Sequence, residues 1–342
     1  MGNSQTGEKM MKTKPRIAII GGAGFIGSSL AEYLKSRFSI RVLDLKSPGL
    51  TEQIEYRCCD IQCFPMLLYN LVDVDLVIHS AVIQIPRINE QIQLGYETNI
   101  RGTENVCEAV DNKRNIRGLL LAGSWHTIGE REVNGIIDEE FGFRPDKVER
   151  RARLYVLSKI AQEAIVRFHD EMSDKIFGII RLGTVLGEGM PEKTAANLFI
   201  QQGLRGDAIT PYRQSMHRPM LYVNINDICR AFENYIDKIL DGTMEKEKDS
   251  LEHIVNVYYP KPMTILELAQ SIQDSITEST DRKIIPKLEI VDTHEEVLFK
   301  ESDKNLMRVD INKARNFLNL ECLKSPRESI RGLVHKYRKK IK

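Results

Sequence analysis

Tyr155 and Lys159 are the residues of this sequence whose types and spacing most directly suggest chemistry. They are four residues apart in a segment with a helical pattern, so they would share one face of a helix. A free tyrosine has a pKa of about 10, which is too high for a base at neutral pH. A neighbouring ammonium favours the phenolate, which would accept the proton of an alcohol. A hydride would then leave the same carbon, and this indicates alcohol oxidation.

Three glycines near the N-terminus predict a binding loop for a dinucleotide. Gly21, Gly24 and Gly27 follow the apolar run Ile17 to Ile20, which predicts a buried strand, and a helical pattern begins after Gly27. Gly21 permits a sharp turn, Gly24 lets the backbone approach a phosphate, and Gly27 lets the helix pack close to the strand. The free N–H groups of the helix N-terminus would then bind a pyrophosphate.

Asp44 ends the next mostly apolar strand, 23 residues after Gly21. This is near the spacing of about 20 expected for a carboxylate that binds an adenosine ribose. Such a carboxylate accepts hydrogen bonds from both ribose hydroxyls and repels a 2′-phosphate, so Asp44 favours NAD over NADP. Asp60, just after the third predicted strand, is placed to bind an adenine amino group. A carboxylate that merely occupies a strand–helix turn is the alternative for Asp44.

Ser124, Trp125 and His126 follow one another at the end of the fifth predicted strand. Ser124 is placed to hydrogen-bond the reacting oxygen, or it only caps the strand end. Trp125 and His126 are expected to face the same pocket. His126 is either an acid–base group, because imidazole titrates near neutrality, or a wall residue that shapes the pocket.

Alternating strands and helices predict an α/β fold with a parallel sheet. Strands are expected at residues 16–20, 40–44, 54–58, 75–79, 117–122 and 176–181, and helices at 25–37, 63–71, 88–112 and 152–172. Regularity is lost from about 183 to 220, apart from a helix at 194–205. Further elements are a helix at 226–241, a strand at 253–258, a helix at 264–276 that begins at a Thr cap, and a basic amphipathic helix at 325–342.

These patterns divide the chain into a disordered leader and two domains. The leader covers residues 1–14. A Rossmann-type, doubly wound parallel sheet covers 15–182, and residues 221–258 return to it. Residues 183–220 and 259–342 form a smaller mixed α/β domain that would bind the substrate.

Composition excludes several classes of protein. The net charge of +1 over 342 residues suggests neither a nucleic-acid nor a membrane partner. No apolar run approaches the length of about 18 residues that a membrane span needs. The six cysteines show no Cys-x-x-Cys pair, which is typical of reduced thiols in a cytoplasmic protein and predicts no metal site.

The chain resembles the extended short-chain dehydrogenase/reductase family, which contains nucleotide-sugar epimerases and dehydratases. The resemblance extends over nearly the whole length. The motifs that carry it are Gly21 to Gly27, Asp44, Asp60-Ile61, His79 to Ala81, Asn99 to Thr103, Ser124, Tyr155 with Lys159, Arg181, Val223 to Asp227, Asn256-Val257 and Thr264 to Leu268.

The resemblance implies bound NAD, an active site between two domains, and often a homodimer. Tyr155 would be the base, and Ser124 would be a proton relay. Lys159 would lower the pKa of Tyr155 and bind the ribose of the cofactor. The cofactor-binding residues would be Gly21, Gly24, Phe25, Ile26, Gly27, Asp44, Asp60, Ile61, Ser80, Ala81, Asn99, Tyr155 and Lys159.

Departures from the family pattern bear on the reaction and the substrate. Dehydratases carry an Asp-Glu pair where this chain has Trp125 and His126, and decarboxylating relatives carry a glutamate at the position of His126. A 4-epimerase needs only the hydroxyl, the tyrosine and the lysine, which all remain. The arginine that usually contacts the nucleotide diphosphate aligns with Met220. The substrate-binding candidates are Trp125, Thr184, Asn197, Arg218 and Lys300, and the basic segment 150–153 is either an anion site or a solvated helix start.

Three functions follow as hypotheses. The first is an NAD-dependent epimerase that transiently oxidises a hydroxyl of a nucleotide sugar and returns the hydride. The second is a net NAD-dependent dehydrogenase of a non-nucleotide alcohol or sugar acid, suggested by the missing arginine at Met220. The third is an NAD-binding regulatory protein without turnover.

Overall fold

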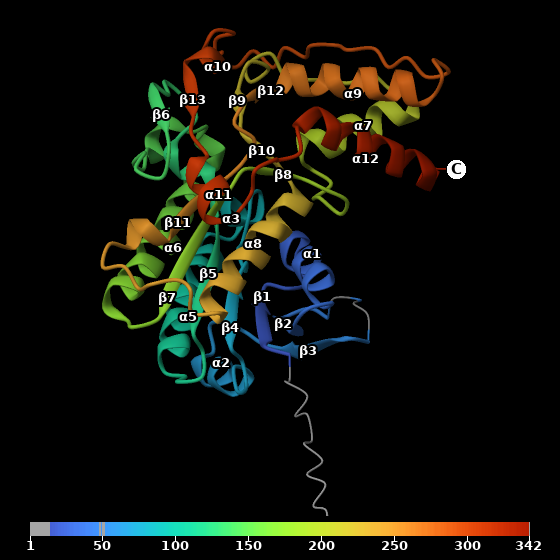
Figure 1. The fold of residues 1–342 in the computed structure, drawn as a ribbon. Helices are drawn as coiled ribbons and strands as arrows, with labels where there is room; N and C mark the ends of the chain where they lie inside the picture. The colour runs from blue at the N-terminus through green and yellow to red at the C-terminus, as the bar shows by residue number, and fades with distance from the viewer. Residues whose placement is uncertain (1–13, 48, 50–51, 342) are drawn as a thin grey trace, which may run out of the picture.

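The chain folds around a seven-stranded, fully parallel sheet (Figure 1). This computed structural model describes residues 14–47, 49 and 52–341, so residues 1–13 of the expected leader lie outside the described residues. The strand order is β11-β7-β5-β4-β1-β2-β3. The strands are β1 (Arg16–Ile20), β2 (Ser39–Asp44), β3 (Ile54–Cys58), β4 (Leu76–His79), β5 (Gly118–Ser124), β7 (Ile176–Leu182) and β11 (Ile254–Val257). The predicted Rossmann-type sheet is confirmed.

Helices cover both faces of the sheet because successive strand residues point in opposite directions. Ile17 and Ile19 face a core that includes α1 (Phe25–Leu34) and α8 (Ile225–Leu240). Ala18 and Ile20 face a second core on the other side, built from α2 (Phe64–Asn70), α5 (Gly102–Asp111) and α6 (Arg153–Met172). The apolar strands therefore have no polar face, as their sequences predicted.

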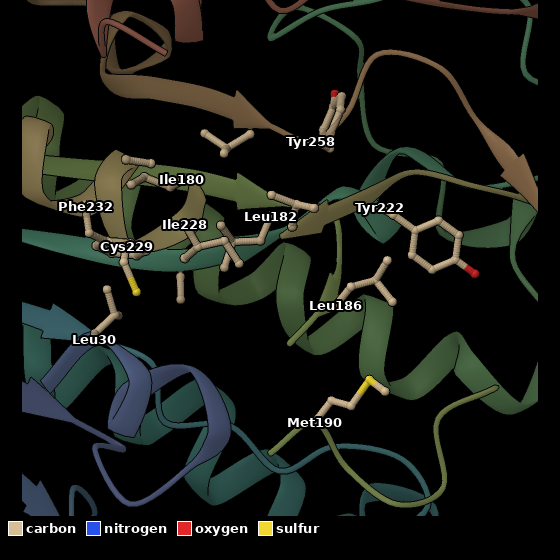
Figure 2. Close-up of a cluster of buried hydrophobic side chains, with 14 of the residues drawn as sticks. Leu30, Ile180, Leu182, Leu186, Met190, Tyr222, Ile228, Cys229, Phe232 and Tyr258 are labelled. Carbon is tan, nitrogen blue, oxygen red and sulfur yellow. The ribbon is translucent and has the colours of Figure 1, made fainter. Parts of the chain in front are cut away.

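The first of these cores continues beyond the sheet into the C-terminal part of the chain (Figure 2). Leu30 of α1 lies near Ile228, Cys229 and Phe232 of α8, and near Ile180 and Leu182 of β7. From there the buried side chains run on to Leu186, Met190, Tyr222 and Tyr258. One hydrophobic cluster thus joins the sheet to the segments that follow β7.

The C-terminal elements gather at one end of the molecule, where Figure 1 shows α7, α9 and α12 close together. The helices are α7 (Ala195–Arg205), α9 (Ile265–Ser279), α10 (Asp303–Leu306), α11 (Asn312–Phe317) and α12 (Pro326–Ile341). Three two-stranded sheets accompany them: β8 (Thr184–Leu186) with β10 (Tyr222–Asn224), β9 (Pro219–Met220) with β12 (Met263–Thr264), and β6 (Gly135–Ile137) with β13 (Met307–Val309). These short strands were not predicted, because two or three residues carry no readable periodicity.

The helix predicted over 88–112 is confirmed in large part, and it is broken only at Gln91. The chain forms α3 (Arg87–Glu90) and then, without a further break, α4 (Ile92–Tyr96), a π-helical turn (Glu97–Arg101) and α5. Gln91, with φ −129° and ψ 69°, interrupts the first helix. The π-helical turn contains Asn99, whose buried amide is bonded to the backbone of Ile83.

The described part of the chain contains no helix that is both long and apolar enough to cross a bilayer. All six cysteines are free thiols.

A buried ion pair fixes α6 to β7. Arg181 Nη2 lies 2.6 Å from Glu163 Oε1, and both side chains are at most 2% exposed. Arg181 Nη1 also donates to the backbone oxygen of Glu139 at 2.9 Å. Since α6 carries Tyr155 and Lys159, this pair holds the helix in register with the sheet.

We predict that Glu163→Ala lowers the free energy of unfolding by about 3–5 kcal/mol, because it leaves the Arg181 charge buried without its partner. Urea denaturation of the two proteins measures this difference. Glu97→Ala is the matched control, since Glu97 forms an exposed pair with Arg101 on one helical turn and its loss costs within about 0.5 kcal/mol. Equal costs for the two variants would contradict the prediction.

Candidate active site

A cleft of about 890 Å³ opens at the carboxyl ends of the parallel strands. Its floor includes Ile20 of β1, the Ser80-Ala81 segment after β4, Ser124 of β5 and Leu182 of β7. The strand order reverses direction between β1 and β4. In open α/β sheets, this switch point is where a crevice forms and ligands bind.

The glycine loop at this switch point fits a dinucleotide diphosphate. Gly21 has φ +79°, and a Cβ there would lie 2.5 Å from the backbone nitrogen of Ala81. A Cβ on Gly27 would lie 2.4 Å from Gly21 O. Gly24 precedes α1 and lines the cleft together with Phe25 and Ile26. The backbone therefore leaves a cradle at a helix N-terminus, which suits an anionic phosphate.

The carboxylate of Asp44 is already oriented at the same end of the cleft. Its Oδ2 accepts from Ala23 N at 3.0 Å and its Oδ1 accepts from Lys46 N at 3.1 Å. Carboxylate oxygens keep further lone pairs after these bonds, so Asp44 can still accept from two ribose hydroxyls. Asp60 and Ile61 line the cleft nearby. The structure therefore brings together Asp44, Asp60 and Ile61, which the sequence predicted to bind the cofactor.

Asn99, predicted to bind the cofactor, does not line the cleft. Its side chain is fully buried and exchanges hydrogen bonds with the backbone of Ile83 at 2.7 and 3.0 Å. Its Nδ2 also donates to Ser158 Oγ at 2.9 Å. Asn99 thus ties the cleft-lining loop at Ile83 to α6.

Tyr155, Ser124 and Lys159 meet at the sheet end of the cleft. Ser124 lies close enough to the Tyr155 hydroxyl for its side chain to favour the phenolate and so lower the pKa of Tyr155. Ser124 Oγ accepts from His126 N at 3.3 Å. Lys159 is buried, and its Nζ donates to the backbone oxygen of Ala122 at 2.9 Å. All three side chains line the cleft beside the glycine cradle.

Burial disfavours the charged forms of both Tyr155 and Lys159. Burial raises the pKa of Tyr155 to about 12, and the hydrogen bond with Ser124 opposes it only in part. Burial likewise lowers the pKa of Lys159 to about 8, against the opposing effect of Glu163. Lys159 was expected to lower the pKa of Tyr155, but the groups of the protein alone leave this pKa raised.

A second polar group lies on the cleft wall beyond Ser124. His126 lines the cleft, and its Nδ1 is 2.5 Å from Oε1 of the buried Glu130. Arg218 Nη2 donates to the same oxygen at 2.5 Å, and its Nη1 lies 3.3 Å from Glu149. Burial alone would raise the pKa of Glu130, but Arg218 and His126 hold it at about 2. Glu130 was not among the candidates predicted from the sequence, although it lies four residues after His126.

Trp125, Asn197 and Lys300 do not line the cleft, whereas Thr184 and Arg218 do. The indole of Trp125 is buried, and it donates to Thr184 Oγ1 at 3.1 Å from behind the cleft wall. Asn197 is bonded to Met190 O at 2.9 Å. Lys300 is exposed outside the cleft.

Cations dominate the lining of the cleft. Its acidic side chains are Asp44 and Asp60, both near the glycine loop, and its basic side chains are Lys46, Arg87, Arg151, Lys159, Lys193 and Arg218. Arg87 begins α3, Arg151 lies in a 3₁₀ helical turn (Arg150–Ala152), and Lys193 lies in a turn before α7. Of these three cations, only Arg151 belongs to a segment that was an anion-site candidate from the sequence. Within the described residues, no group of three or more potential ligands is arranged to hold a metal ion.

Gly24→Ala should separate cofactor binding from folding. Gly24 has φ −75° and ψ 170°, which alanine adopts freely, and the methyl would meet Gly21 O at 3.2 Å. We expect a nearly unchanged melting temperature. The Kd for NAD, measured by calorimetry, should be at least about tenfold higher, which is a loss of about 1.4 kcal/mol in binding free energy. In Gly27→Ala, by contrast, the turn itself should be disrupted. Wild-type affinity in Gly24→Ala would contradict the diphosphate cradle.

Known proteins with similar sequences and structures act on sugars and sterols. The chain is 24% identical over 340 residues to UDP-glucuronic acid decarboxylase 1 of Danio rerio, covering 96% of this chain and 74% of that protein. It is 29% identical over 190 residues to the decarboxylating sterol-4-alpha-carboxylate 3-dehydrogenase of Bos taurus, covering 54% of this chain and 50% of that protein. The fold matches UDP-glucuronic acid 4-epimerase from Bacillus cereus, solved with UDP-glucuronic acid and NAD, with a TM-score of 0.74 and 19% identity over 96% of this chain and all of the other.

The model of one protein family matches residues 17–245, well over half of the chain. The matched region includes the glycine cradle, Asp44, Ser124, Tyr155 and Lys159, which are the residues that the cleft brings together. The cofactor of this family is NAD, which agrees with the fit of the cradle and of Asp44. The chain therefore belongs to the NAD dependent epimerase/dehydratase family.

Proposed function

We propose that this protein oxidises a hydroxyl of a nucleotide sugar transiently and then returns the hydride, as an epimerase does. The observation that carries this proposal is the meeting of Tyr155, Ser124 and Lys159 beside the glycine cradle. Bound NAD would supply the hydride acceptor and the positive charge of its oxidised ring.

Each residue of this group has a role that its contacts support. Ser124 Oγ accepts from His126 N, so its own proton is free to be donated toward Tyr155 or the substrate oxygen. Tyr155 takes the hydroxyl proton once positive charge favours its phenolate. Lys159, whose Nζ donates to Ala122 O, would bind the ribose and supply part of that charge.

The charges of the cleft support an anionic substrate. Beyond the two carboxylates near the glycine loop, its ionisable lining is basic, with Arg87, Arg151 and Lys193 among the cations. A nucleotide diphosphate brings negative charge to such a site, and a sugar acid adds a carboxylate. The relatives named above include two enzymes of UDP-glucuronic acid, so we take UDP-glucuronic acid and UDP-glucose as the first substrates to test.

A net dehydrogenase is the second candidate. Met220 lines the cleft where the family pattern led us to expect an arginine for the diphosphate, and this favours a smaller alcohol or sugar acid. The two candidates differ in the fate of the cofactor. An epimerase gives product without lasting NADH, whereas a net dehydrogenase accumulates NADH in step with product.

Tyr155→Phe should lower turnover by about 10²–10⁴-fold, because it removes the general base, while NAD still raises the melting temperature. We would follow NADH absorbance and identify products by NMR, with UDP-glucuronic acid and UDP-glucose at saturating NAD. Tyr69→Phe is the matched control, since Tyr69 is exposed on α2. Undiminished turnover in Tyr155→Phe would contradict the proposed base.

We also propose that two copies of the chain pair through α6. Leu157, Phe168 and Met172 are 45%, 65% and 73% exposed. Their spacings of 11 and 4 residues place them on one face of the helix. A row of exposed apolar side chains of this kind is typical of a protein interface.

Replacing Phe168 and Met172 by aspartate should therefore convert a dimer into monomers of 39.2 kDa. Light scattering after gel filtration measures the mass. The same double change at Tyr69 and Val72, which are exposed on and just after α2, away from α6, should leave the dimer intact. A monomeric wild-type protein would contradict the interface.

A further inference from the structure

We propose that His126 is a second acid–base group of the active site, positioned by Glu130 and Arg218, and that it transfers a proton at the carbon next to the transient carbonyl. This inference rests on the proposed function, since the carbonyl must first be formed at Tyr155.

The tautomer of His126 follows from the charge of Glu130. Glu130 is 1% exposed, yet Arg218 and His126 keep it ionised. An ionised carboxylate only accepts hydrogen bonds, so the His126 nitrogen 2.5 Å away, Nδ1, carries the proton. In the neutral ring, Nε2 is then unprotonated and able to act as a base.

Nε2 is also free to meet a substrate. The His126 side chain is 20% exposed and lines the cleft. Within the described part of the chain, Nε2 has no hydrogen-bond partner and is not among the buried polar atoms left without one. It is therefore accessible from the cleft.

Arg218 is a positioning residue in this group. Both of its Nη atoms are committed to protein carboxylates, one to Glu130 and the other to Glu149. It was predicted to bind the substrate, but a guanidinium held in this way is better placed to stabilise Glu130. A buried carboxylate without such a partner would tend to be protonated.

The ring of His126 is not connected to the Tyr155 group. Its backbone nitrogen donates to Ser124 Oγ, but its side chain is bonded to Glu130. Tyr155 interacts with Ser124, and Lys159 Nζ donates to Ala122 O. The cleft wall thus carries two acid–base groups with separate hydrogen-bond partners.

A simple alcohol oxidation needs only one of these groups. The hydroxyl proton goes to Tyr155 and the hydride leaves the same carbon, giving a carbonyl. His126 Nε2 can then take a proton from the adjacent carbon, whose C–H electron pair forms the double bond of an enolate, with the oxygen held by Tyr155 and Ser124. Return of the proton from Nε2 restores the carbonyl compound.

Two measurements on the NAD-loaded protein test this. The first is the histidine-ring ¹H–¹⁵N NMR spectrum above neutral pH, in which the signal missing from His126→Gln identifies His126. We expect the Nδ1–H tautomer. The second is deuterium uptake from D₂O into UDP-glucuronic acid and UDP-glucose, read by NMR at the carbon next to the oxidised one. The rate of transient NADH formation is measured in the same reactions for comparison.

His126→Gln should lower deuterium uptake by about 10²–10⁴-fold and lower NADH formation far less. Glu130→Gln should also lower deuterium uptake. If this single variant does not fold, the double variant Glu130→Gln with Arg218→Met replaces it, because it removes both buried charges. Glu132→Gln is the matched control, because Glu132 is exposed and pairs with Lys147.

An Nε2–H tautomer of His126 would overturn the proposal. The proposal would also be overturned if the wild type formed NADH without taking up deuterium. Equal losses of deuterium uptake and of NADH formation in His126→Gln would overturn it as well. If neither sugar reduces NAD, the proposed function fails for these substrates, and the tautomer still decides whether Glu130 positions His126.

Discussion

The close approach of the first strand–helix turn to the end of β4 determines where the active site can form. A side chain at Gly21 would collide with Ala81, and one at Gly27 would collide with Gly21 itself. Because β1 and β4 are neighbours at the point where the strand order reverses, the crevice opens there. Ser124 on β5 and Thr184 after β7 then follow along the same edge of the sheet, which orders the cleft from the cofactor end to the substrate end.

Burial disfavours the charged forms in both proposed acid–base groups of this cleft, but it decides the charge state in only one of them. Around Tyr155 and Lys159 it favours the neutral forms, so this group depends on positive charge brought by the cofactor. Around Glu130, by contrast, Arg218 outweighs the effect of burial and the carboxylate stays ionised. One group therefore responds to what binds, whereas the other is held in one charge state by the fold.

The parts of the site that depend on local sequence were predictable. The glycine spacing, the strand that ends at Asp44 and the Tyr155–Lys159 pair each depend on residues close in the chain, and the structure brings them to one cleft. The helix predicted over 88–112 is broken only at Gln91, and its π-helical turn is not visible in hydrophobic periodicity. Glu130 and Arg218 are 88 residues apart, and no local pattern indicates that they share a buried bond. Arg87 and Lys193 were missed because a single cation at the start of a short helix or in a turn carries no local motif.

Arg218 is bonded to protein carboxylates, so the negative charge of the proposed substrate would have to be bound by other cations of the cleft. An arginine whose fork is occupied by Glu130 and Glu149 has few donors left for a phosphate or a carboxylate. The remaining cations at that end are Arg87, Arg151 and Lys193. Arg151 is itself bonded to Glu149, and Asn89 Nδ2 donates to its backbone oxygen. Arg87 and Arg151 lie in short helical turns and Lys193 in a loop turn. Because connecting segments vary more readily than strands, we expect substrate choice to depend on them. The proposed chemistry depends instead on Ser124 of β5 and on Tyr155 and Lys159 of α6.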